Sequence, residues 1–347
     1  NLIQQNAYIL ILATGMLLCI LTCGNIDLSV GSVAGFIGAI SAVFILKMNM
    51  PVFPAILLSL LIGVLIGAWH GFWIAYVGVP AFITTLAGML IFRGLTMVIL
   101  QGTSLAPLPK AYTFMSAGFI PDIADIKGIN LLAILAGILA SVLYILYELS
   151  DRASKKRYNF EVSSNSAFWA KVISIVAVIN AFTYALARYK GIPTVLVIVV
   201  SLVLIYSFIT NKTIPGRHIY AFGGNPKAAK LSGVKTKKVL FWVYVNMGFL
   251  AALAGIVFTG RLNSATPKAG NGFELDAIAS CFIGGASTTG GIGTVVGAIV
   301  GGLLMGVLNN GMSIMGVSID WQQAIKGFVL LAAVAFDVYS KSKSRVL

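Results

Sequence analysis

The sequence has 347 residues, of which 59% are hydrophobic and only 10% charged, and its mean hydropathy is +0.96. Soluble domains carry about 25% charged residues, so the composition excludes a soluble domain and predicts an all-α polytopic membrane protein. The formal net charge of +14 does not indicate nucleic-acid binding. The Lys and Arg residues concentrate in short segments beside apolar runs, where they set topology and attract anionic membrane lipid.

The first apolar run, at 3–23, has the length of a membrane-spanning helix. The polar sequence GNIDLSVGS at 24–32 then separates it from a Gly-rich apolar run that ends at 46. Asp27 lies between the two runs, and an ionisable side chain at that depth is costly unless it is paired or hydrated. The pattern therefore predicts either a broken helix that faces a central cavity, or a tight loop at the membrane surface.

Further spans are predicted at 54–77, 82–100 and 131–149. The segment 101–130 between the last two contains three prolines and little net charge, and alternation of sides places it outside the cell. There it is either a plain connector or a surface for a soluble partner. Basic residues of the sequence DRASKKRY, which starts at Asp151, then indicate the cytoplasmic side.

Two more spans are predicted at 168–186 and 192–209. They are followed by the segment 211–238, the one long polar interruption in the second half of the chain. This segment contains no acidic residue and seven basic ones, namely Lys212, Arg217, Lys227, Lys230, Lys235, Lys237 and Lys238. A loop this basic between two spans is expected in the cytoplasm.

The centre of that loop has the pattern of a short helix. Asn225 can cap it, Pro226 suits its first position, and Gly233 can end it. Ala228 and Ala229 would leave one face small enough for close approach to a soluble partner. The alternative is an ordinary basic loop that only sets topology.

The remaining C-terminal runs are at 239–259, 275–283, 294–308 and 323–338. Residues 275–283 are too few to cross a membrane, so they predict a half-helix with Glu274 and Asp276 at its start. The glycine string at 284–297 lacks the GKS or GKT ending of a phosphate loop. The sequence thus predicts about eleven passes, two of them short.

Several of these stretches resemble one family. The sequences GRHIYAFGGNPKAAKLSGV, NIDLSVG and VPAFITTLAGMLIFRGL, together with 260–302, are similar to permease subunits of bacterial monosaccharide ABC importers. The branch is the one that serves ribose, galactose and xylose. Galactose-type permeases generally lack the extension at 151–190, and the xylose-type branch has something like it. The xylose or multiple-monosaccharide type is the most similar, with the chain as a single permease domain, 1–347. The family usually has one more span ahead, so an upstream helix is expected.

The resemblance implies a bacterial inner-membrane permease without its own ATPase, whose loop at 211–238 meets an ABC ATPase subunit. ATP and Mg would be bound by that partner, and no cofactor or metal by this chain. A periplasmic sugar-binding protein and a second permease copy would complete the importer. The coupling residues would be Asn225, Pro226, Ala228, Ala229, Lys230, Ser232 and Gly233, and the polar pathway candidates are Asn25, Asp27, Ser29, Thr84 and Thr85.

The second hypothesis is an ion-coupled secondary transporter of a small polar solute, which would have the same composition and broken helices. Its coupling site would use the buried acids Asp27, Glu274 and Asp276. An enzyme is not indicated, because the sequence contains no Walker loop, no HExxH motif and only two His residues.

Overall fold

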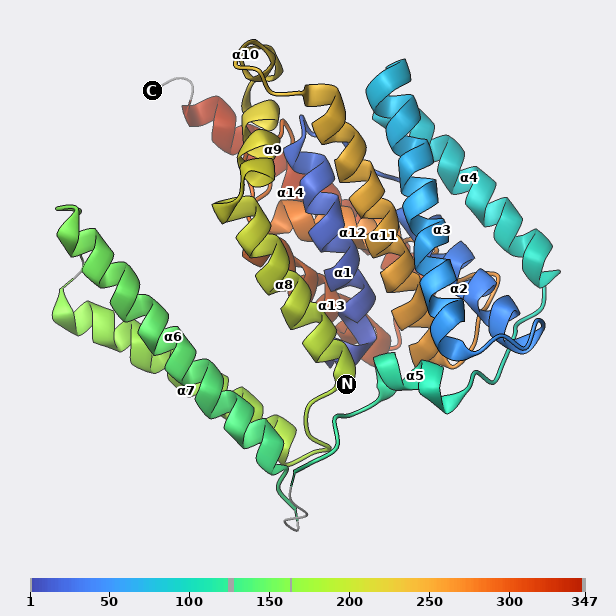
Figure 1. Ribbon diagram of the computed structural model, residues 1–347, viewed down its shortest axis with the longest axis horizontal. Helices are drawn as coiled ribbons and strands as arrows, with labels where there is room; N and C mark the ends of the chain where they lie inside the picture. Colours follow the sequence, from blue (N-terminus) through green and yellow to red (C-terminus); the bar gives the residue numbers. More distant parts are fainter. Residues whose placement is uncertain (1, 124–127, 163, 345–347) are drawn as a thin grey trace. The chain divides into compact units, whose positions relative to one another are not determined.

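The computed structural model describes residues 2–123, 128–162 and 164–344, with side chains up to 339 (Figure 1). Its regular elements within these ranges are helices, apart from two isolated β-bridges. The predicted all-α polytopic fold is therefore confirmed.

Nine helices of the described part are long and apolar enough to cross a membrane. They are α1 (Leu2–Leu21), α3 (Val52–Phe72) with the π-helical turn η1 (Trp73–Val77), α4 (Ala81–Leu100), α6 (Leu131–Arg157), α7 (Asn165–Ala187), α8 (Thr194–Lys212), α11 (Thr236–Leu262), α13 (Val295–Ile314) and α14 (Ile319–Ser344). Two apolar helices are shorter, α2 (Val30–Leu46) and α12 (Phe273–Ile283). The predicted passes each correspond to one of these eleven helices.

The chain divides into two compact units, of which the larger comprises 1–117 and 195–347. Helix α1 lies at the centre of this unit, and almost all of its residues from Ile9 to Leu21 are buried. It packs against α11, α12 and α13, while α11 also packs against α2 and α3. Small residues permit this close packing: a Cβ at Gly248 of α11 would lie 2.3 Å from the carbonyl oxygen of Gly63 in α3.

The smaller unit, 118–194, consists mainly of the paired helices α6 and α7. Asn180 of α7 donates a hydrogen bond of 2.8 Å to the hydroxyl of Ser141 in α6, and Lys171 pairs with Glu148 at 2.7 Å. The chain enters and leaves this unit through a short bridge in which Phe119 pairs with Pro193. The extension predicted at 151–190 falls inside this unit and begins within α6.

The segment 101–130, predicted as a plain connector or a surface for a soluble partner, contains regular structure that neither alternative specified. The segment contains helix α5 (Lys110–Ala117), which packs against α11. Tyr112 of α5 is fully buried, and its hydroxyl lies 2.7 Å from the hydroxyl of Ser41 in α2. The three prolines around α5 indicated irregular structure, so the short helix was not predicted. The buried Tyr112 side chain packs the segment against the larger unit. Residues 124–127 lie outside the described ranges.

The basic segment 211–238 is also more ordered than expected. Helix α8 continues to Lys212, and two further helices follow, α9 (Ile214–Gly224) and α10 (Pro226–Leu231). Helix α10 lies at the opposite end of the larger unit from α5 (Figure 1). The lysines predict the cytoplasmic side for α10, and the same prediction places α5 on the outer side.

Candidate coupling site

Helix α10 has the caps that its sequence predicts. The side chain of Asn225 accepts a hydrogen bond of 3.0 Å from the backbone nitrogen of Ala228, and Pro226 occupies the first helical position. Gly233 follows the helix with φ +85°, a conformation that glycine adopts without strain. A short capped helix is therefore present, ending one residue before the predicted end at Ser232.

Of the two alanines on the face of α10 that was expected to meet a partner, only Ala228 is accessible. The Ala229 side chain is only 5% exposed, because α10 packs back on α9 and α11. Leu231 is 90% exposed, while Ala228, Lys230 and Ser232 are exposed too. The expectation that Ala229 faces a partner is therefore wrong, and the outward apolar group is Leu231.

Helix α9, which the sequence pattern did not predict, connects α8 with α10. The Thr213 hydroxyl caps it by accepting a hydrogen bond from the nitrogen of Gly216, and a proline occupies its first turn. Its buried residues include Ile219 and Gly223. The sequence did not indicate this helix, because three of its eleven residues are glycine and glycine is a poor helix former.

The C-terminal end of α9 lies against the chain where α1 ends. A Cβ at Gly223 would lie 1.7 Å from the carbonyl oxygen of Leu21, so only glycine fits there. The thiol of Cys23 is 3.3 Å from the carbonyl oxygen of Phe222. Helix α9 is thus in direct backbone contact with the break between α1 and α2.

The same end of α9 contacts the glycine-rich segment between α12 and α13. The nitrogen of Gly291 donates a hydrogen bond of 3.0 Å to the carbonyl oxygen of Leu21, and a Cβ at Gly223 would lie 2.5 Å from that nitrogen. The Tyr220 hydroxyl donates to the carbonyl oxygen of Gly293 at 2.7 Å. We call this three-way contact the junction; it comprises Leu21, Cys23, Tyr220, Phe222, Gly223, Gly291 and Gly293.

The polar segment does separate two helices, since α1 ends at Leu21 and α2 begins at Val30. Both alternatives, a broken helix facing a cavity and a tight loop at the membrane surface, stay predictions. Asp27 is buried, and its Oδ1 accepts hydrogen bonds from the nitrogen and the hydroxyl of Ser29 at 2.8 and 2.6 Å. Asn25 donates to the carbonyl oxygen of Thr22 at 2.6 Å. These polar side chains therefore stabilise the break locally, and their role in a pathway remains a prediction.

Thr84 and Thr85 are buried in α4. Their hydroxyls donate to carbonyl oxygens one turn earlier, those of Pro80 at 3.4 Å and Ala81 at 2.9 Å. Among the described residues, no hydrogen bond connects this pair with the polar residues of the break. The five predicted pathway residues thus do not form one hydrogen-bonded site.

Helix α12 is short, as predicted. It has eleven residues and is flanked by Gly272, with φ +77°, and Gly284. At about 1.5 Å per residue it covers roughly half of a bilayer core about 30 Å thick. Glu274 and Asp276 lie in its first turn, and both are buried.

Asp276 has partners on three other helices. Lys326 of α14 lies 2.9 Å from Oδ1 and 3.1 Å from Oδ2. Asn309 of α13 and Tyr8 of α1 each donate at 3.4 Å. Lys326 was missed in the sequence, because no local pattern connects two residues fifty positions apart. The carboxylate that was a candidate ion-coupling site is therefore held in an ion pair.

Replacing Asp276 by Asn is expected to destabilise the protein, because it leaves the Lys326 ammonium without its counter-charge. Asp276 is 1% exposed, and removal of one partner of a buried pair costs about 3–5 kcal/mol. The apparent Tm in detergent should fall, and the double variant Asp276→Asn/Lys326→Met should recover much of the loss. Asp151→Asn, which breaks the exposed pair with Lys155, is the control and should leave Tm unchanged. A Tm of Asp276→Asn equal to that of the control would contradict the assignment.

The family model described as "Branched-chain amino acid transport system / permease component" matches residues 1–334. The chain belongs to this permease family. It is a multi-pass protein of the cytoplasmic membrane, and no solved structure matches it.

The chain is similar to sugar permeases among curated proteins. It is 38% identical over 343 residues to the xylose transport system permease protein XylH of Haemophilus influenzae, covering 99% of this chain and 89% of that protein. It is 36% identical to XylH of Escherichia coli K12, covering 99% and 85%. It is 35% identical to the ribose import permease protein RbsC of the same strain, covering 97% and 84%. These relatives confirm the resemblance to the ribose, galactose and xylose branch.

Proposed function

We propose that this chain is the transmembrane permease of an ABC importer that brings a monosaccharide into the cytoplasm, with xylose the first sugar to test. The names of the relatives, which are xylose and ribose permeases, support the substrate class. The observation that carries the proposal is the capped helix α10, with exposed Leu231 among lysines at the cytoplasmic end of the larger unit.

Three partners complete this proposal. An ABC ATPase subunit binds ATP and Mg and receives α10. A second copy of this chain supplies the other membrane half, since the sequence contains one basic loop rather than two. A periplasmic binding protein selects the sugar and delivers it to the outer side. This chain supplies the membrane path and contributes no ATP hydrolysis of its own.

Coupling would then run from α10 through α9 to the junction. Movement of the ATPase subunits displaces α10, and α9 follows because the two helices are in contact. At the junction, α9 contacts both the break between α1 and α2 and the segment between α12 and α13. A shift of α9 would therefore move both interrupted regions together, which is a geometry suited to opening one side of a path and closing the other.

The alternative, an ion-coupled secondary transporter, finds no support. Of its three candidate acids, Asp276 is paired with Lys326 and Asp27 accepts two hydrogen bonds from Ser29. Neither of these two carboxylates is arranged as an unoccupied cation site. The third acid, Glu274, is also buried, and its Oε2 has no hydrogen-bond partner among the described residues.

Reconstitution in proteoliposomes tests the proposal. With the ATPase subunit inside and the sugar-loaded binding protein outside, uptake of labelled xylose or ribose should require ATP. The permease alone under an imposed proton or sodium gradient should show no uptake. Gradient-driven uptake without any ATPase would refute the ABC assignment.

A further inference from the structure

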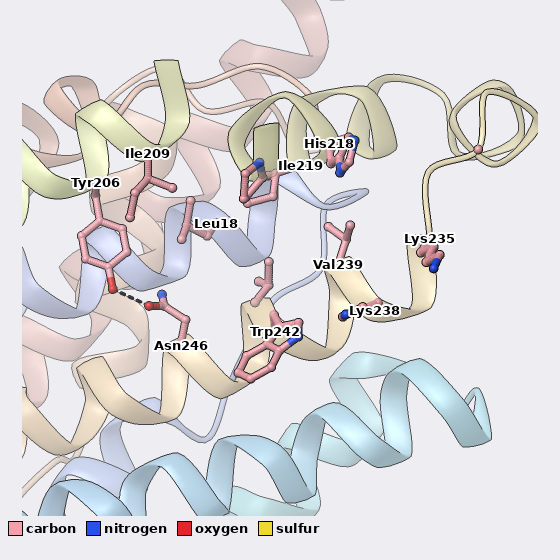
Figure 2. Close-up of a pocket in the computed structure, with 13 residues that line it drawn as sticks. Leu18, Tyr206, Ile209, His218, Ile219, Lys235, Lys238, Val239, Trp242 and Asn246 are labelled. Atoms are coloured by element: carbon pink, nitrogen blue, oxygen red, sulfur yellow. Dashed lines mark hydrogen bonds between the residues drawn. The ribbon is translucent and has the colours of Figure 1, made fainter. Parts of the chain in front are cut away.

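A cavity of about 490 Å³ lies in the larger unit between α8, α9 and α11, with Leu18 of α1 also in its wall (Figure 2). Thirteen residues line it, among them Leu18, Tyr206, Ile209, Lys235, Lys238 and Asn246. It is separate from the junction, although α9 contributes to both.

The two ends of this cavity differ in chemistry, as Figure 2 shows. One end lies in the membrane-spanning part, where the Tyr206 hydroxyl donates a hydrogen bond to the Asn246 side chain and aliphatic groups form the remaining wall. The other end lies beside α10 and carries Lys235, Lys238 and His218. None of the thirteen described residues that line the cavity is acidic.

We propose that this cavity binds one anionic phospholipid from the cytoplasmic leaflet, with its phosphate at Lys235 and Lys238 and an acyl chain between α8 and α11. Three observations favour this occupant. Basic pockets between membrane helices on the cytoplasmic side recognise anionic lipid headgroups. A soluble anion would leave the apolar wall uncovered, and a zwitterionic lipid such as phosphatidylcholine would bring its own choline cation close to the two lysines. Trp242, 56% exposed, lies between the two ends, and tryptophan is enriched at membrane interfaces.

The position of the site gives the lipid a mechanical role. Its walls include Pro215 and Ile219 of α9 on one side and Val239 and Trp242 of α11 on the other. A chain that fills this space supports α9 at a fixed distance from α11. Lipid occupancy would thereby favour one position of α9. The binding site itself stands independently of the proposed coupling function.

The experiment measures lipid retained by the purified full-length chain. The protein is placed in nanodiscs of phosphatidylglycerol and phosphatidylcholine, extracted into mild detergent, and analysed by native mass spectrometry. Wild type is expected to retain phosphatidylglycerol in preference to phosphatidylcholine. Each lysine near the membrane surface contributes about fivefold to anionic lipid affinity, so Lys235→Gln/Lys238→Gln should weaken retention about 25-fold.

Two further variants distinguish lipid binding in this cavity from general electrostatic attraction of anionic lipid to the protein surface. Ile209→Trp fills the apolar end without changing charge, and it should also abolish retention. Lys156→Gln/Arg157→Gln removes two exposed cations of α6 outside the cavity and should retain lipid as wild type does. Equal retention of both lipids by wild type would overturn the proposal. So would unchanged retention in the two cavity variants, or an equal loss in the α6 control.

Discussion

A permease with Glu in place of Leu231 is expected to enter the membrane normally and to lose ATP-driven sugar uptake by about 30-fold or more. Leu231 is 90% exposed on α10 and contacts little of its own chain, so the substitution does not disturb folding. Burying a Leu side chain against a partner contributes about 1.5–3 kcal/mol. A carboxylate at this position would also have to be buried against the ATPase subunit without a counter-charge, which adds a further cost in binding free energy. Stimulation of the ATPase subunit by the permease should fall with uptake.

Leu231→Met is the matched control, because Met keeps the apolar contact and tolerates irregular packing. It should couple as wild type does. The Ala229→Glu variant is less informative, since Ala229 is buried against the chain and a large acid there would displace α10 itself. Normal ATPase stimulation by Leu231→Glu would exclude this side chain from the docking surface.

Gly223→Ala is expected to separate ATP hydrolysis from transport. The added Cβ would lie 1.7 Å from the carbonyl oxygen of Leu21, a distance that requires α9 to move away from the break. Helix α10 and its exposed face are unaltered, so the permease should still stimulate the ATPase. Coupling free energies between two sites are typically about 1–3 kcal/mol, so loss of this contact should reduce coupling by about 5- to 150-fold.

Much of the fold could be predicted because its causes are local. A span needs about twenty apolar residues, and each predicted run corresponds to a helix. The short helix α10 was predictable from Asn225, Pro226 and Gly233, whose capping roles depend on residue type alone. Glycines around α12 likewise indicated where that helix ends.

What could not be predicted depends on packing between distant segments. The Asp276–Lys326 pair joins two helices fifty residues apart, and no periodicity indicates it. The orientation of Ala229 depends on α9, whose glycines indicated a loop. Those glycines are explained by the junction, because Gly223 must lie against the backbone of Leu21. The close backbone contact therefore requires glycine at this position, although glycine has a low helix propensity.

The most direct test of the proposed coupling route is the number of ATP molecules hydrolysed per sugar imported by Gly223→Ala and Gly224→Ala. The two glycines are neighbours in α9, but a Cβ at Gly224 would meet nothing within 4 Å. With the same ATPase and binding protein in proteoliposomes, Gly224→Ala should match the wild-type ratio. Gly223→Ala should hydrolyse ATP while importing little sugar, so its ratio should rise at least about fivefold. Wild-type ratios for both variants would show that α9 does not transmit the movement of α10 to the interrupted helices.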